Sequence, residues 1–248
     1  MKKIITGKPL IQLQSVDSTN VYAAQLLRST EADEGTVILT AYQTSGKGHA
    51  GNRWISEAGT NLLFSLILRP EFLMAERQFY LCMSISNAIH DFVSLIAQPA
   101  LIKWPNDILL QGKKLAGILI ENKLLNLKLH TSVVGIGLNV NQKVFPPDLP
   151  DPISLALATG REFDLSESLK ALLRSLDEYI NQLYEEKYAE IKTYYLNNLY
   201  RLNEWAEYAD ASGNFSGRIA DIADTGELIV LKRNGILKHY GFKEIAFT

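Results

Sequence analysis

Apolar residues along this chain of 248 residues recur with two different periods, and these periods mark the elements that the sequence predicts. Runs in which apolar residues alternate or are continuous are typical of β-strands, whereas apolar residues three and four positions apart are typical of helices. The predicted strands cover residues 10–16, 36–42, 61–68, 100–104, 108–110, 114–121 and 127–137. The run 114–121 is almost unbroken in its apolarity, which predicts a central position in a sheet.

Helical periods occupy three stretches of the chain. The first begins after four residues that favour helix N-termini, 17–20, the second spans 76–97, and the third is opened by Asp164 and runs to about Tyr195. Between the last predicted strand and the third helix, four prolines exclude regular secondary structure and predict a surface loop. They are Pro146, Pro147, Pro150 and Pro152.

Short β-segments replace the helices beyond residue 202. They cover residues 217–220, 228–231 and 236–240, and the glycine-containing turns 224–226 and 233–235 join them. This pattern predicts a small barrel-like β module. We therefore expect an α+β fold of two domains, residues 1–200 and residues 201–248.

The composition excludes several classes of protein. A net charge of -2 provides no overall basic field to attract nucleic acid. The single cysteine, Cys82, excludes an internal disulfide and a cysteine-rich zinc site. No apolar run approaches the roughly 20 residues of a membrane span, and the N-terminus lacks the pattern of a signal peptide. We expect a cytoplasmic protein with no nucleic-acid or membrane partner.

The segment Gly46–Gly51 fits the pattern G-x-G-x-x-G of dinucleotide-binding turns, but its context does not. Such a turn should open a helix whose N-terminal amides receive a pyrophosphate. Residues 52–60 have no helical period, and a predicted strand follows them. The glycines therefore belong to a loop between two strands, and the basic residues of this loop suit the binding of an anion. These are Lys47, His49 and Arg53.

Two clusters near strand ends carry a lysine. In Lys103-Trp104-Pro105-Asn106-Asp107, proline ends the strand, the lysine suits a phosphate, and the Asn and Asp oxygens suit Mg²⁺; the alternative is a turn with an exposed lysine. Lys114 stands at the mouth of the next strand, and Gly117 within that strand is typical of close approach by a ligand or another backbone. The alternative there is a solvated lysine after a turn.

Two further clusters are rich in hydroxyl and amide groups. Gly135–Asn141 ends a strand with two glycines and two asparagines, whose amide oxygens suit a metal or a nucleotide. The alternative is an ordinary exit from a strand into a loop. Ser18-Thr19-Asn20 suits hydrogen bonding to a small polar ligand, and the alternative is a helix cap.

Together and in this order, these motifs resemble those of the biotin protein ligases. They are D-S-T-N at 17–20, Q-T-S-G-K-G at 43–48 running on to Trp54, K-W-P-N-D at 103–107, K-L-A-G-I-L at 114–119 and G-I-G-L-N at 135–139. The resemblance covers nearly the full chain. It implies a mixed sheet with helices, akin to the catalytic domains of class II aminoacyl-tRNA synthetases, followed by an SH3-like barrel. It also implies that ATP activates biotin as biotinyl-AMP, which then modifies one lysine of a biotin carboxyl carrier domain.

The resemblance further implies a role for each matching residue. The residues implied for biotin are Ser18, Thr19, Asn20, Gln43, Gly46, Lys47, Gly48, His49, Lys114 and Gly117. Those implied for ATP are Trp54, Lys103, Asn106 and Asn139, while Asp107 and Asn106 would hold Mg²⁺. Catalysis is assigned to Lys114, Lys103 and Lys47, because cations offset the repulsion between a carboxylate and a triphosphate.

Two features depart from the family's pattern. Family members often place arginine among the positions held here by Lys47, His49, Ala50 and Asn52. Because a neutral imidazole holds phosphate poorly near pH 7, we expect Lys47 rather than His49 to retain the adenylate. The pattern also begins close to residue 1, so we expect a ligase without the N-terminal DNA-binding domain and repressor activity of bifunctional members.

Two other functions remain open on the sequence. One is a lipoate or octanoate ligase or transferase of the same superfold, and the other is a biotin-binding protein without catalysis. The sequence does not identify the acceptor carboxylase. It also leaves a homodimer open, because exposed strands at a sheet edge would allow one.

Overall fold

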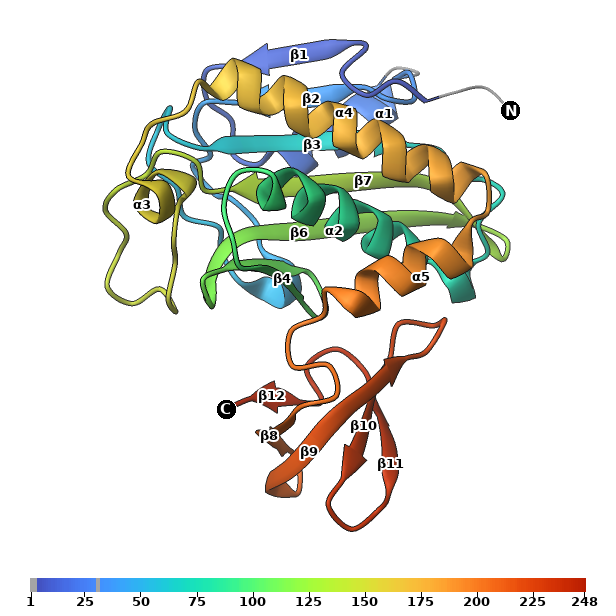
Figure 1. The fold of residues 1–248 in the computed structure, drawn as a ribbon. Coiled ribbons are helices and arrows are strands. Elements are labelled where there is room, and N and C mark those ends of the chain that lie inside the picture. The colour runs from blue at the N-terminus through green and yellow to red at the C-terminus, as the bar shows by residue number, and fades with distance from the viewer. Residues whose placement is uncertain (1–3, 30–31) are drawn as a thin grey trace.

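The computed structural model describes residues 4–29 and 32–248, which form two separate sheets (Figure 1). The larger sheet has seven strands in the order β1-β2-β3-β7-β6-β5-β4. Its strands are β1 (Leu10–Leu13), β2 (Val37–Thr40), β3 (Leu62–Leu68), β4 (Ala100–Lys103), β5 (Asp107–Leu110), β6 (Lys113–Leu125) and β7 (Lys128–Leu138). Only β1 and β2 pair in parallel, so the sheet is mixed.

All seven predicted strands are confirmed, but the strand at the middle of the sheet is not the expected one. β6, which contains the apolar run 114–121, is an interior strand between β5 and β7. β7 holds the central place although Gly135 and Gly137 interrupt its apolar pattern. The apolar run of β6 reflects burial on the face that includes Ala116 and Ile118, whereas its cavity side is only half-buried, and apolarity does not record the order of strands.

Alternation along the strands divides the larger sheet into two apolar faces. Ile38, Ile67 and Val133 pack with Ala23 of α1 (Thr19–Ser29) on one face. Neighbouring strand residues point to the other face, where α2 (Phe79–Ser94), α4 (Leu165–Tyr184) and α5 (Tyr188–Asn197) cover the sheet (Figure 1). Within the described residues, no helix is long and apolar enough to span a membrane.

The predicted helix 164–195 is wrong as a single element. The chain turns at residues 185–187, where Glu186 has a positive φ of 54°, and the turn separates α4 from α5. The apolar period continues across the break because Ile191 and Tyr195 are also fully buried. Asn87 of α2 fixes α5 by donating a hydrogen bond of 2.9 Å to the carbonyl of Ile191.

Residues beyond the proline-rich loop form a short helix, α3 (Leu155–Thr159), that the sequence analysis missed. Ser154 caps it by accepting a hydrogen bond from the amide of Leu157, and Gly160 ends it in the left-handed conformation. A helix of five residues is too short to show a period of 3.6 residues.

The C-terminal residues form a five-stranded antiparallel sheet in the order β11-β10-β9-β8-β12. Its strands are β8 (Trp205–Asp210), β9 (Gly213–Ile222), β10 (Leu228–Lys232), β11 (Leu237–Tyr240) and β12 (Ala246–Phe247). The three predicted β-segments are confirmed. β8 and β12 were missed, because β8 begins with an exposed Trp205 and β12 has only two residues.

Asp210, at the end of β8, links three strands of the C-terminal sheet. Its side chain is only 1% exposed, and its carboxylate accepts hydrogen bonds from Ser212, from Tyr240 (2.7 Å) and from Lys232 and Lys238 (3.0 Å each). These hydrogen bonds hold the pKa of Asp210 well below its usual range, and the hydrogen bond from Ser212 has the largest effect.

Because the folded-state pKa of Asp210 lies below the unfolded value of 3.8, the ionised group stabilises the fold above that pH. The stabilisation is lost as the pH falls through the folded-state pKa. We expect Asp210→Asn to lower the midpoint of thermal unfolding at pH 7, and the difference from the wild type to shrink at pH 3. The same difference at both pH values would contradict this account of the carboxylate.

Trp104 joins the two sheets. Its indole Nε1 donates a hydrogen bond of 2.9 Å to the carbonyl of Gly226, in the turn between β9 and β10. Gly226 has a φ of 98°, and a Cβ atom there would lie 2.6 Å from Phe79. Tyr80 reaches the same turn by donating a hydrogen bond of 2.8 Å to Asp224. The C-terminal sheet is therefore fixed against α2 and the end of β4.

We expect Trp104→Phe to lower the free energy of unfolding by about 1–3 kcal/mol, because it leaves the buried Gly226 carbonyl without its donor. Denaturant-induced unfolding measures this change. Trp205→Phe is the matched control, because Trp205 is 41% exposed and should tolerate the substitution. An equal loss in both variants would contradict a specific role for Trp104.

Candidate functional site

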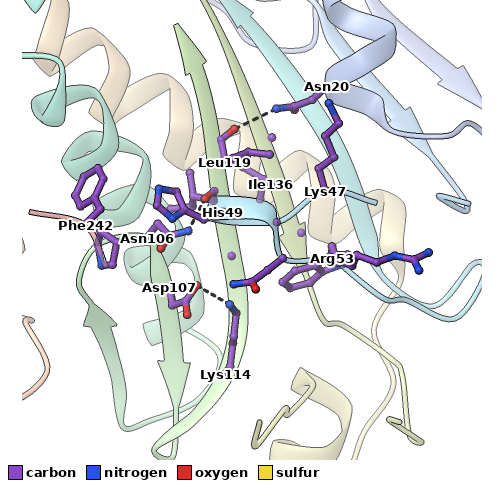
Figure 2. A pocket seen from close by; sticks show the side chains of 18 of the residues that line it. Asn20, Lys47, His49, Arg53, Asn106, Asp107, Lys114, Leu119, Ile136 and Phe242 are labelled. Carbon is purple, nitrogen blue, oxygen red and sulfur yellow. Dashed lines mark hydrogen bonds and ion pairs between the residues drawn. The ribbon is translucent and has the colours of Figure 1, made fainter. Parts of the chain in front are cut away.

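An open cavity of about 290 Å³ lies between the glycine loop (residues 46–54), strands β5 to β7 and the C-terminal sheet (Figure 2). Most of the residues predicted for the site line it. These are Ser18, Thr19, Asn20, Gln43, Lys47, Gly48, His49, Trp54, Lys103, Asn106, Asp107, Lys114 and Gly117. Two predicted residues are not among its lining residues: Gly46, which lies in the loop behind it, and Asn139, which lines a neighbouring cavity.

Strand register brings three of the sequence motifs together. Lys103 on β4 is the cross-strand partner of Asp107 on β5. Asp107 is also the partner of Gly117 on β6, and Gly117 is the partner of Gly137 on β7. Residues directly opposite one another on neighbouring strands face the same side of a sheet. One row across four strands therefore carries a cation, a carboxylate and two glycines.

Lys114 reaches this side of the sheet because β6 contains a β-bulge. Lys114 and Gly117 are three positions apart, so regular alternation would place their side chains on opposite faces. The register with β5 skips Leu115, and this extra residue restores both positions to the cavity side. Lys114 Nζ then lies 2.7 Å from Asp107 Oδ1 as an ion pair, without the angle of a hydrogen bond (Figure 2).

The floor of the cavity is a flat surface of two glycines covered by an indole. A Cβ atom on Gly137 would lie 2.4 Å from Trp54 Cε2, and one on Gly117 would lie 3.0 Å from Trp54 Cζ3. Side chains at these positions would therefore displace the indole. Lys114 Nζ lies 5.9 Å from the centre of the Trp54 ring, so the edge of this floor is basic.

The start of α1 supplies the polar end of the cavity. Asn20 Nδ2 donates hydrogen bonds to the Leu119 carbonyl (3.3 Å) and to Glu121 Oε2 (2.7 Å). Ser65 Oγ lies 2.6 Å from Asn20 Oδ1 and 2.7 Å from Thr19 Oγ1. These contacts fix both side chains, so this end of the cavity is rigid before any ligand binds.

Gln43 holds the same helix start from the other side. Its Oε1 atom accepts hydrogen bonds from the backbone amide (2.8 Å) and the hydroxyl (3.2 Å) of Thr19. A Cβ atom on Gly46 would lie 3.0 Å from Gln43 Nε2 and 2.5 Å from the Trp54 carbonyl oxygen. Gly46 therefore shapes the cavity by allowing a close approach behind it and does not line it.

The glycine loop folds back on itself as a narrow hairpin. The amide of Gly48 donates to the Asn52 carbonyl (2.7 Å), and the amide of Trp54 donates to the Gly46 carbonyl (2.9 Å). A 3-10 turn, His49–Gly51, forms its tip. The loop thus presents Lys47 and the ring of His49 to the cavity, and Arg53 lines both this cavity and a neighbouring one (Figure 2).

Burial shifts the pKa values of two basic groups. Desolvation lowers the pKa of His49, and the cations Lys243 and Lys114 lower it further against the opposing effect of Asp107. Because the ordinary value is 6.5, His49 is a neutral imidazole at pH 7. Desolvation also lowers the pKa of Lys103, which Asp107 partly offsets.

The candidate metal ligands are one carboxylate and one amide. Asn106 Nδ2 donates a hydrogen bond of 2.8 Å to the Ile118 carbonyl, which leaves its Oδ1 atom as an acceptor beside Asp107. In the part of the chain that the structure describes, no three His, Cys, Asp or Glu side chains gather as a metal cluster. A hard cation here would take its remaining ligands from a substrate, as Mg²⁺ commonly does with phosphates.

A second cavity of about 480 Å³ shares Trp54 and Lys114 with the first. Asn139 lines it, and Asn139 Nδ2 donates a hydrogen bond of 3.0 Å to the Ile153 carbonyl. Asn139 Oδ1 and Trp54 Nε1 are both buried without a hydrogen-bond partner among the described residues. One acceptor and one donor of residues that line this cavity are thus without a protein partner, and the apolar wall of the cavity includes Phe145 and Leu149.

Comparisons with known proteins agree with the geometry of these cavities. The model of the biotin/lipoate A/B protein ligase family matches residues 12–139, which is about half of the chain and includes all of the motifs. The chain belongs to this family.

Curated ligases and a solved ligase structure resemble the chain over most of its length. The biotin--[acetyl-CoA-carboxylase] ligase of Paracoccus denitrificans is 31% identical over 88% of this chain and 92% of its own length. The bifunctional ligase/repressor BirA of Bacillus subtilis is 29% identical over 97% of this chain and 74% of its own length. The biotin protein ligase of Aquifex aeolicus, solved with biotin and ATP, is 29% identical, covers 97% of this chain and 99% of its own, and has a TM-score of 0.80.

The structure adds residues to this family site that the sequence analysis missed. Phe242, Lys243, Ile245 and Phe247 of the C-terminal sheet line the first cavity. Their approach depends on how the two sheets pack, for which the sequence carries no periodic signal. Glu121 and Ser65 were also missed, because they act on the cavity through other side chains, Glu121 through Asn20 and Ser65 through Asn20 and Thr19.

Proposed function

We propose that this member of the family is a biotin protein ligase that joins biotin to ATP and then transfers it to a lysine of a biotin carboxyl carrier domain. The observation that carries the proposal is the shared cavity. Lys47, Lys103 and Lys114 all line it, beside an apolar floor and a rigid polar end. A cavity with this combination suits a small apolar acid that must meet an anionic nucleotide.

Biotin fits the part of the cavity between the start of α1 and the glycine floor. Its ring system requires hydrogen-bond partners, which Thr19 and Gln43 would supply at fixed positions together with Ser18, with Asn20 behind them. Its aliphatic chain would run beside the Trp54 indole, which covers Gly117. Its carboxylate would then end near Lys114, the cation at the mouth of β6.

ATP fits the second cavity, with its phosphates turned toward the first. The Trp54 indole would pack on the adenine ring, and Asn139 Oδ1 would accept a hydrogen bond from an amino group. Lys103 and Lys47 would hold phosphate oxygens. Asp107 and Asn106 would hold Mg²⁺, which would neutralise part of the phosphate charge.

In the first step, a carboxylate oxygen of biotin attacks the α-phosphorus of ATP, the bond to the β-phosphate oxygen breaks, and pyrophosphate leaves. Two anions must meet, so the cations Lys114 and Lys103 lower the barrier by offsetting their repulsion. The ion pair with Asp107 holds Lys114 at the mouth of β6 before substrates arrive. The site therefore needs little rearrangement for this step.

In the second step, the amine of the acceptor lysine attacks the acyl carbon of biotinyl-AMP. An amide forms, AMP leaves, and the nitrogen loses a proton. Solvent at the open cavity takes this proton.

Incubation with biotin, ATP, Mg²⁺ and an isolated biotin carboxyl carrier domain tests the proposal. We expect the mass of the carrier to rise by that of one biotin minus water, and a carrier whose acceptor lysine is replaced by arginine to remain unmodified. No mass increase of the intact carrier would contradict the proposed function.

Three further features remain predictions. We place the boundary between the catalytic part and the C-terminal module between residues 200 and 201, in the turn between α5 and β8. Formation of a homodimer and a cytoplasmic location are also predictions.

A further inference from the structure

The turn between β11 and β12 projects from the C-terminal sheet into the cavity that the larger sheet forms. Phe242, Lys243 and Ile245 of this turn line the cavity together with residues of the glycine loop. The turn is held at its base, where Glu244 accepts a hydrogen bond of 2.8 Å from the Gly241 amide. One wall of the site thus comes from residues far from every ligase motif in the sequence.

Phe242 connects this turn to the tip of the glycine loop. Its ring meets the ring of His49 edge to face, with centroids 5.4 Å apart and an interplanar angle of 83° (Figure 2). The other side of Phe242 packs on Trp104 (5.4 Å) and Phe79 (6.0 Å), which belong to the larger sheet and its covering helix. Phe242 therefore connects the tip of the glycine loop to the end of β4 and to α2.

His49 acts in this contact as an aromatic ring. Burial and the neighbouring cations keep the pKa of His49 low, so it carries no charge at pH 7. A neutral imidazole packs edge to face against a phenyl ring without the loss of a hydrated charge. The tip of the loop consequently lacks the cation that an arginine would supply, although it lies beside the phosphate-binding part of the cavity.

Lys243 supplies a cation at this place. It lines the cavity and is close enough to His49 to act on the charge of the ring. Its φ of 69° is a left-handed conformation, which is uncommon for residues with a Cβ atom and costs about 1 kcal/mol. Glycine would adopt this conformation without the cost, so fold stability alone would favour glycine there.

We propose that the β11–β12 turn completes the ATP site: Lys243 binds a phosphate of ATP, and Phe242 positions the glycine loop through the ring of His49. The proposal rests on the ligase function proposed above. It assigns two residues of the C-terminal module to the nucleotide site. Lys243 binds ATP directly, and Phe242 positions the glycine loop. The loop then closes against the module and not only against the larger sheet.

The decisive variant is Lys243→Gly, which removes the cation and relieves the left-handed strain. We expect the KM for ATP in biotin-dependent exchange of pyrophosphate with ATP to rise about tenfold, and the KM for biotin to change by less than about twofold. The midpoint of thermal unfolding should stay the same or rise. Lys243→Arg should restore the affinity for ATP. Lys123→Ala, on the exposed end of β6, is the control for a change of one charge.

The positioning role of Phe242 has its own pair of variants. His49→Phe keeps an aromatic ring against Phe242 and should retain the wild-type KM for ATP, whereas His49→Ala and Phe242→Ala should both raise it. The double variant His49→Ala/Phe242→Ala should cost no more than Phe242→Ala alone, because that single variant already breaks the contact between the two rings. Additive effects in the double variant would overturn the positioning role.

An unchanged KM for ATP in Lys243→Gly, or equal rises in the KM values for ATP and biotin, would overturn the role of Lys243 while leaving the ligase function intact. If the wild type showed no biotin-dependent exchange, the ligase function would fail instead. The role of Lys243 is then decided by calorimetric binding of a non-hydrolysable ATP analogue to wild type and Lys243→Gly. Equal affinities would overturn it, and weaker binding by the variant would support it.

Discussion

Replacing Lys114 with alanine is expected to lower kcat/KM for biotin-dependent exchange of pyrophosphate with ATP by about 10²- to 10³-fold. The substitution removes the cation that stands between the carboxylate of biotin and the phosphate of ATP. It also leaves Asp107 without the ion pair of 2.7 Å, so a carboxylate beside the reacting anions becomes uncompensated. Both changes raise the barrier of the first step, and they act on one place in the cavity.

Lys113→Ala is the matched control, because Lys113 is the preceding residue of the same strand and is exposed. It changes the net charge by the same amount without touching the cavity. We expect activity close to that of the wild type. Wild-type activity of Lys114→Ala would remove Lys114 from the site, and an equal loss of activity in both variants would show a general effect of charge.

Gly137→Ala is expected to lower kcat/KM by about 10²-fold, because a methyl group there would lie 2.4 Å from Trp54 Cε2 and force the indole off the floor. Gly117→Ala should have a smaller effect, since its methyl group would lie 3.0 Å from the ring and the indole need shift only slightly. A larger loss in Gly137→Ala than in Gly117→Ala would indicate displacement of Trp54. Equal losses in the two variants would indicate that these strands tolerate no side chain at either position.

A double-mutant cycle shows whether the effect passes through Trp54. In a Trp54→Ala background the indole is absent, so Gly137→Ala should cause almost no further loss. A full additional loss in that background would contradict the close approach of Gly137 and Trp54 as the cause.

Much of the site was predictable because strand ends and strand register are written in local sequence. The lysine, asparagine and aspartate of residues 103–107 lie at the end of a strand and in the proline-containing turn after it, and the structure places them where β4 meets β5. Gly117 and Gly137 stand within apolar strands, where a glycine is typical of a close approach. The structure identifies the approaching group as Trp54, which lies more than sixty residues away in the sequence.

Features that depend on a single irregularity or on distant packing were not predictable. The bulge at Leu115 turns Lys114 toward the cavity, yet the apolar run that contains it shows no break. Phe242 and Lys243 reach the cavity through the packing of Trp104 on Gly226, which joins segments about 120 residues apart. The break between α4 and α5 was missed for a similar reason, because buried residues continue across it with a helical period.

The most direct test of the account is biotin-dependent exchange of labelled pyrophosphate into ATP by the wild-type protein, with lipoate and octanoate as alternative acids. The account predicts exchange that requires biotin and Mg²⁺ and is not supported by either other acid. Exchange with lipoate or octanoate in place of biotin, or no exchange with any acid, would contradict it.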